Sequence, residues 1–151
     1  MPLNVAHILD KVVSHAMATG LLERVNGHEP ENPPSHGLTA AVWADQIEPV
    51  RASGLDSVTA RLVFNVRLYS SLQTEPADAV DPALLEAVDT LCAAYIGDFT
   101  LGGLVRDVDI FGTYGMPLST RAGYLQQAGV MFRVMTISLP VVVNDLWNEV
   151  A

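Results

Sequence analysis

Basic residues, cysteines and long apolar runs are all scarce in this chain, and each shortage excludes a class of protein. The 8 lysines and arginines stand against 17 aspartates and glutamates, so the net charge is −9. This balance argues against nonspecific binding of nucleic acid, which needs a basic patch. Cys92 is the only cysteine, so no internal disulfide forms and a reducing compartment is suitable. No run reaches the ~18 apolar residues of a membrane helix. We expect no secretion, because the first residues lack the basic-then-apolar signal pattern.

The rest of the composition indicates a folded chain. Half of its 151 residues are apolar and 17% are charged, which is a globular and not a disordered composition. A chain of this length is most simply one domain, so we expect residues 1–151 to form a single domain. The mean hydropathy of +0.29 is high for a small monomer. Excess apolar surface is often hidden in a subunit interface, and we expect one here.

The stretch 58–69 (VTARLVFNVRLY) predicts the central strand of a sheet, because its residues alternate in character. The even positions are all apolar: Val58, Ala60, Leu62, Phe64, Val66 and Leu68. The odd positions are mostly polar: Thr59, Arg61, Val63, Asn65, Arg67 and Tyr69. We therefore expect one face of this strand to lie against the core and the other to face solvent or a partner.

Helical periodicity and turn signals place the elements before this strand. Apolar residues at three- and four-residue spacing predict a helix over 5–19, and residues 21–25 predict a short strand. The polar, proline-rich stretch 26–37 is a loop of a length that is often functional or mobile. Residues 38–50 predict a strand that pairs with the central strand as an antiparallel hairpin.

A second helix is predicted after a polar loop over 70–80. Asp81 is a good N-cap, Pro82 takes the first helical position, and Gly97 ends the helix. The expected apolar stripe of this helix is Leu84, Leu85, Val88, Leu91, Cys92, Tyr95 and Ile96.

The remaining residues predict further strands. We expect a third long strand over 99–111 and a closing hairpin of 124–126 with 130–143. Pro140 cannot donate a ladder hydrogen bond, so the last strand should lie at an edge or leave the sheet there. Strands that follow one another without intervening helices predict an α+β fold, with a mainly antiparallel sheet flanked by two helices.

Two groups of residues have the elements of a metal or acid–base site, and neither matches a known pattern. His28 and His36 flank two glutamates in the first loop, where a solvated loop is the better interpretation. Asp107 and Asp109 lie two apart on an expected strand, so both carboxylates share one face, which we interpret as solvated or ion-paired. We identify no catalytic, cofactor-binding or metal-binding residue.

Other reactive side chains have structural interpretations. His7 and His15 lie too far apart on the first helix to bind one metal ion and are read as surface histidines. Cys92 belongs to an apolar stripe, so it is a core residue. The tryptophans could stack on nucleic acid, but with this net charge packing or a protein interface is favoured.

The polar face of the central strand is the candidate interface, because arginine and tyrosine are enriched in protein contacts. The candidate subunit or partner contacts are Arg61, Asn65, Arg67, Tyr69, Trp43 and Trp147. An ordinary solvated sheet face is an equally open interpretation.

The order of these elements resembles the tail-terminator proteins of long-tailed bacteriophages. The shared texture is an N-terminal amphipathic helix, a proline-rich loop, two long strands, the Asp81–Pro82 helix and a closing hairpin. That hairpin is similar to tail proteins of actinobacterial phages and prophages, in Leu125, Gly129, Arg133-Val134-Met135, Leu139-Pro140 and Asn144-Asp145. The resemblance covers most of the chain but not the Gly102–Gly103 stretch or the long first loop.

The resemblance implies a structural virion protein and not an enzyme. It would form a hexameric ring at the head-proximal end of the tail tube, end tube polymerisation and provide the surface for head–tail joining. Its partners would be other copies of itself, the tail-tube protein and the head–tail connector or stopper protein. DNA would pass without specific binding, and no cofactor or membrane is implied. The protein would assemble in the host cytoplasm and reside in the virion neck.

Other functions remain open at this stage. The chain could be another neck protein, such as a head-completion or stopper protein. It could also be a small metal-dependent enzyme built around Asp107, Asp109 and a loop histidine, or a monomeric regulatory binding module.

Overall fold

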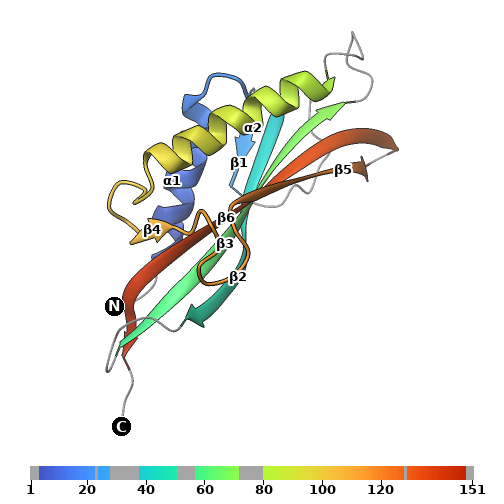
Figure 1. Ribbon diagram of the computed structural model, residues 1–151. Helices are drawn as coiled ribbons and strands as arrows, with labels where there is room; N and C mark the ends of the chain where they lie inside the picture. The colour runs from blue at the N-terminus through green and yellow to red at the C-terminus, as the bar shows by residue number, and fades with distance from the viewer. Residues whose placement is uncertain are drawn as a thin grey trace.

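Both helices pack on the same face of one twisted sheet in the computed structural model (Figure 1). The structure describes residues 4–22, 24–27, 38–50, 57–71, 80–127 and 129–148. The elements in chain order are α1 (Val5–Ala18), β1 (Arg24–Asn26), β2 (Thr39–Val50), β3 (Ser57–Ser71), α2 (Val80–Gly97), β4 (Asp107–Val108), β5 (Ser119–Gln127) and β6 (Val130–Asn148). The predicted α+β fold class with a mainly antiparallel sheet is therefore confirmed.

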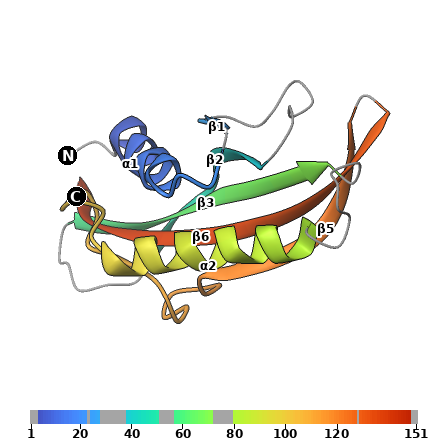
Figure 2. The same ribbon diagram turned by 90° about the horizontal axis from the view of Figure 1, so that it is seen from above.

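The stretch predicted as the central strand is β3, and it lies in the middle of the sheet. The strand order is β1-β2-β3-β6-β4. β5 also pairs with β6, at an earlier part of that strand than β4 does. β2, β3 and β6 pair antiparallel, with Val66 of β3 between Val42 and Ile137. β1 pairs with β2 in parallel. Figure 2 shows that the hairpin of β5 and β6 extends past the end of α2.

The core lies between the helices and the even-numbered residues of β3, as their alternation predicts. Leu62, Phe64, Val66 and Leu68 are fully buried there with residues of α1 and α2. The two helices also contact each other, because the Tyr95 hydroxyl donates a hydrogen bond of 3.1 Å to the Val12 carbonyl. The helices therefore form one layer over one face of the sheet.

The apolar stripe of α2 is wider than the surface that the sheet covers. Its buried residues are Val80, Leu84, Ala87, Leu91 and Tyr95. Leu85 and Ile96, which were expected in the stripe, are 55% and 43% exposed. They project beside the buried row, because residues one position away along a helix turn by about 100°. Their apolar side chains therefore remain on the outer surface.

The expected third strand over 99–111 is wrong. Only Asp107–Val108 is extended, and it pairs with β6. Leu101, Gly102 and Gly103 have φ angles of 47°, 69° and 85°. Three consecutive residues in the left-handed region turn the chain and cannot belong to a strand. The apolar residues of this stretch serve a folded-back loop that packs against the core through Leu101 and Val105.

The expectation that β6 leaves the sheet at Pro140 is wrong, but Pro140 does lie at a gap in the pairing on the outer side of the strand. Pro140 lies within β6, in register with Val63 of β3. Its carbonyl accepts the Asp109 N–H at 2.9 Å on the other side of the strand. A residue's N–H and C=O point to the same side, so the missing N–H faces this side too. On this side, the pairing with β5 reaches only Ser138 and the pairing with β4 covers Val141 and Val142. Pro140 lies between these two ladders and interrupts neither.

Several element boundaries differ from the sequence expectations. α2 begins at Val80, so Asp81 lies in its first turn rather than at the N-cap. The closing hairpin is longer than expected, with β5 beginning at Ser119. Most residues of the expected loops at 26–37 and 70–80 fall outside the described residues. Within the described segments, every helix is too short or too polar to cross a membrane.

Candidate functional site

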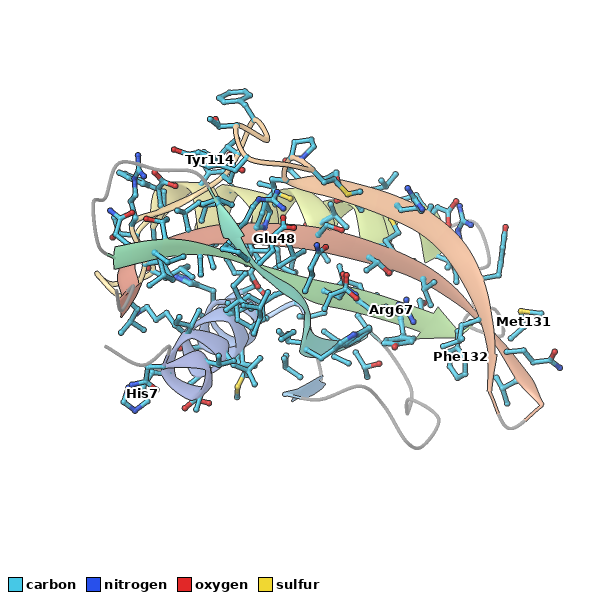
Figure 3. The ribbon with its side chains drawn as sticks, turned by 90° about the horizontal axis from the view of Figure 1, so that it is seen from below. His7, Glu48, Arg67, Tyr114, Met131 and Phe132 are labelled. Atoms are coloured by element: carbon cyan, nitrogen blue, oxygen red, sulfur yellow. The ribbon has the colours of Figure 1, made fainter. Side chains whose placement is uncertain are left out.

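The face of the sheet opposite the helices carries the candidate site. We call this the open face, because no described helix packs on it; Figure 3 views it with the helices behind the sheet. A groove of about 720 Å³ lies on it, lined by β2, β3, β5, β6 and the loop at Gly115 and Met116. The odd-numbered residues of β3 form part of its floor. The alternation therefore predicted this second face but not its burial, because four of the six odd-numbered residues from 59 to 69 are buried within the chain: Thr59, Arg61, Val63 and Tyr69.

Arg61 and Asp109 form a buried ion pair at one end of the groove. The Arg61 side chain is only 2% exposed, and its Nε donates to Asp109 Oδ2 at 3.2 Å. Another nitrogen of Arg61 donates to the Met116 carbonyl. Asp109 also accepts the backbone N–H groups of Thr113 and Tyr114, at 2.8 and 3.1 Å. The pair ties the loop after β4 onto the open face, so Arg61 is not a surface contact.

Asp107 and Asp109 are both ion-paired, which is one of the two interpretations made from the sequence, but they do not share a solvated face. Asp109 is buried against Arg61, whereas Asp107 is half-exposed and lies 3.6 Å from Arg106. Tight packing of the loop on Arg61 also explains Gly115, where an added Cβ would lie 2.8 Å from an Arg61 nitrogen. Charge pairing over a long sequence separation decided the arrangement, and sequence spacing did not reveal it.

Arg67 projects into the groove from β3 and is held in place by two neighbours. Its Nε donates to Thr136 Oγ1 at 2.9 Å. Its guanidinium lies 5.1 Å from the centroid of the Trp43 ring, within cation–π distance. Asn65 lies in register between Trp43 and Ser138. The structure thus brings Arg67, Asn65 and Trp43 together as the interface prediction grouped them.

Arg121 is a groove residue that sequence reasoning missed. It lies on β5 in register with Thr136, which pairs on its other side with Arg67. The two arginines therefore flank Thr136 in one row across three strands. The sequence did contain a signal for this residue. If the strand pairing of the hairpin is extended away from the turn at Gly129, Arg121 lies opposite Thr136.

Of the remaining predicted contacts, Tyr69 is buried within the chain, whereas the prediction for Trp147 falls on a side chain outside the described part of the structure. Tyr69 is buried in a small cluster with Ala41, Phe132 and Val134 on the open face. Its ring meets Phe132 edge-to-face, with centroids 6.5 Å apart. Tyr69 therefore supports the base of the β5–β6 hairpin. Trp147 lies in β6 in register with Val58, and its side chain lies outside the described part of the chain.

The histidines of α1 differ in their surroundings. His7 is exposed and contacts the Asn4 side chain, as expected of a surface residue. His15 is half-buried, and its Nε2 lies 2.8 Å from Asp98 Oδ2, so its assignment as a surface histidine is wrong. The Gly102 N–H, followed by His15, lowers the pKa of Asp98 below its usual value. This contact joins α1 to the loop after α2.

Neither chemistry considered from the sequence gains a site within the described residues. His28 and His36 lie outside them, and the described side chains include no cluster of three metal-binding groups. Cys92 is half-buried, and desolvation raises the pKa of its thiol. Its stripe position in α2 is therefore consistent with a structural role.

Comparison with known proteins identified no relative, so the function is argued from the open face and the sequence. The chain matches no protein-family model, and no curated protein shows significant sequence similarity to it.

Proposed function

We propose that this chain is a structural protein of a phage neck. It forms a hexameric ring at the head-proximal end of the tail tube, ends tube polymerisation and provides the surface for head–tail joining. The observation that carries the proposal is the open face, a preformed concave surface with arginine, amide and hydroxyl groups on which no described helix packs. A repeating assembly needs such a surface on every copy.

Exposed apolar side chains support contact with other proteins. Phe111 is 90% exposed on the loop after β4, and Tyr124 and Met17 are more than half exposed. A partner that covers such a side chain removes its apolar surface from water, which favours association. Their positions on a loop, a strand and a helix would allow contacts on more than one side, as a ring between a tube and a connector requires.

The two edges of the sheet also favour repetition. Past Ala41, β2 has no partner among the described strands on its outer side, and β5 pairs only with β6. Unpaired strand edges on opposite sides of a sheet suit contacts that repeat from head to tail. Such contacts close into a ring when the rotation that relates neighbouring copies is a whole-number fraction of a full turn.

The test begins with the mass of the purified protein. Size-exclusion chromatography with light scattering should give six times the 16.2 kDa of one chain. Co-expression with the tail-tube protein of a neighbouring reading frame should then give tubes with rings at one end in electron micrographs. Tubes made without this chain should lack the rings and grow without a defined length.

A protein that stays monomeric at high concentration, and also with tail tubes present, would contradict the proposal. Under that outcome, a monomeric binding module becomes the better description.

A further inference from the structure

Two arginines of the open face lack an acidic partner among the described residues. Among the arginines with described side chains, three pair with aspartate: Arg61, Arg106 and Arg133. Arg67 and Arg121 form no ion pair with any described acid, although the chain has 17 acids and 8 bases. Asp45 and Glu48, the described acids that line the groove, form no ion pair with either arginine, so both guanidinium groups can receive carboxylates from a second chain.

The geometry around these arginines suits a pair of carboxylates. Arg67 and Arg121 lie two strands apart in one row, which places their backbones about 10 Å apart. Arg67 is already ordered by Trp43 and Thr136, so little side-chain freedom remains to be lost on binding. The neighbouring row adds the Asn65 amide and the Ser138 hydroxyl to the groove. Guanidinium groups bind carboxylates with high geometric specificity.

The outer surface of α2 has the complementary chemistry. This helix of 18 residues contains Asp81, Glu86 and Asp89 and no lysine or arginine. Glu86 and Asp89 are exposed, lie three residues apart on the same side and pair with no described base. Leu85 and Ile96 flank them and are also exposed. We call these four residues the acidic ridge.

We propose that the groove of one copy receives the acidic ridge of a second copy. Glu86 and Asp89 pair with Arg67 and Arg121, and Leu85 and Ile96 cover apolar parts of the groove. This inference rests on the proposed ring and names the contact between its subunits.

The other charges in the groove position the ridge. Asp45 and Glu48 line the groove at the β2 side. They repel an acidic helix, so the ridge lies toward β5 and β6, above the two arginines. The groove lies on the open face, and α2, which carries the ridge, packs on the other face of the sheet. Each copy therefore uses its groove for one neighbour and its ridge for the other, which is a head-to-tail contact.

Two charge-reversed variants test this contact. Arg67→Glu with Arg121→Glu reverses the groove and moves the net charge from −9 to −13, whereas Glu86→Arg with Asp89→Arg reverses the ridge and moves it to −5. Each variant alone sets like charges against each other, so self-association should weaken about 100-fold or more. Arg106→Glu, which reverses an exposed arginine away from the groove, is the control and should keep the wild-type mass.

Mixing the two variants is the decisive measurement. In an alternating assembly every reversed groove meets a reversed ridge, so the mixture should recover the wild-type mass by light scattering. A single chain with all four changes has the wild-type net charge and should also recover it. Circular dichroism checks the fold of each variant. If the groove variant does not fold, Arg121→Glu alone takes its place, because Arg121 is exposed.

The outcomes separate this contact from the proposed ring. Variants that all form the wild-type ring would overturn the contact and leave the ring intact. A wild type that grows into filaments, is disrupted by both variants and is restored by mixing would support the contact and overturn the ring. Loss of assembly in both variants without recovery on mixing would overturn the pairing of groove with ridge.

Discussion

Arg61 and Asp109 place two opposite charges beneath the loop that closes one end of the groove. Burial makes Asp109 dependent on Arg61, because removal of the arginine leaves a buried carboxylate without a counterion, whereas Arg61 also lies 3.9 Å from the more exposed Glu48. The sequence suggested that Arg61 faces solvent or a partner, since alternation along β3 shows which side a residue faces but not what covers that side. The covering loop begins 48 residues later.

Asp109→Asn should lower the free energy of unfolding by up to about 3–5 kcal/mol, because it removes the nearer and buried counterion of Arg61 and leaves the more exposed Glu48, 3.9 Å away. Asp107→Asn is the matched control, since it removes a half-exposed carboxylate two residues away and should cost less than about 1 kcal/mol. Urea unfolding followed by circular dichroism measures both. Equal losses for the two variants would contradict the structural role of Asp109.

Asp98 should make stability depend on pH in the acid range. Its pKa is lowered in the folded protein, first by the Gly102 N–H and then by His15. The contribution is therefore complete above the ordinary aspartate pKa of about 4 and is lost as the pH falls through the lowered value. The wild type and Asp98→Asn should differ most near neutral pH and converge as the solution is acidified. A difference in unfolding free energy that is constant from pH 7 to pH 3 would refute this assignment.

β3 is the element whose structure the sequence predicted best. Its strict alternation has a direct physical cause, because one side is buried under two helices and the other carries a polar groove. The stretch 99–111 is similarly apolar but folds into turns, because positive φ angles at Leu101 and the next two residues exclude a strand. Apolar content alone did not distinguish a buried strand from a buried loop.

Phe64→Ala should destabilise the protein by about 3–5 kcal/mol, because it leaves a cavity under the helices. Ile47→Ala on the adjacent strand provides the control, since Ile47 is 47% exposed. Its cost should stay within about 1 kcal/mol. Chemical denaturation at equal protein concentration compares the two, and similar midpoints would place Phe64 outside the core.

At the scale of the whole molecule, the candidate site joins residues that are distant in sequence. Arg67 and Arg121 meet across Thr136 only because β6 pairs with β3 on one side and β5 on the other. The sequence supported Arg67 as an interface residue through its position on a polar strand face. It did not reveal Arg121, since the register of three strands is a property of the assembled sheet. The acidic ridge could not be recognised from the sequence either, because it depends on which side of α2 packs on the core.

The whole protein should unfold in one step at a fixed concentration. A single core cluster includes residues of α1, α2, β2, β3 and β6, so no helix can leave without exposing the rest. Far-ultraviolet circular dichroism and tryptophan fluorescence should therefore give the same midpoint in urea. Two separated midpoints would show that the open-face cluster around Tyr69, against which Trp43 packs, unfolds independently of the helical layer.

The position of Pro140 has a consequence for how β6 finds its alignment during folding. A slip of β6 by one residue would turn Thr136 and Ser138 into the core and expose Met135 and Ile137. A slip by two residues would keep the faces but set the proline opposite β5 or β4, where a ladder donor would be missing. Burial penalises the odd slips and hydrogen bonding the even ones. Pro140 therefore favours the native register of β6, in which its missing N–H falls between the ladders with β4 and β5.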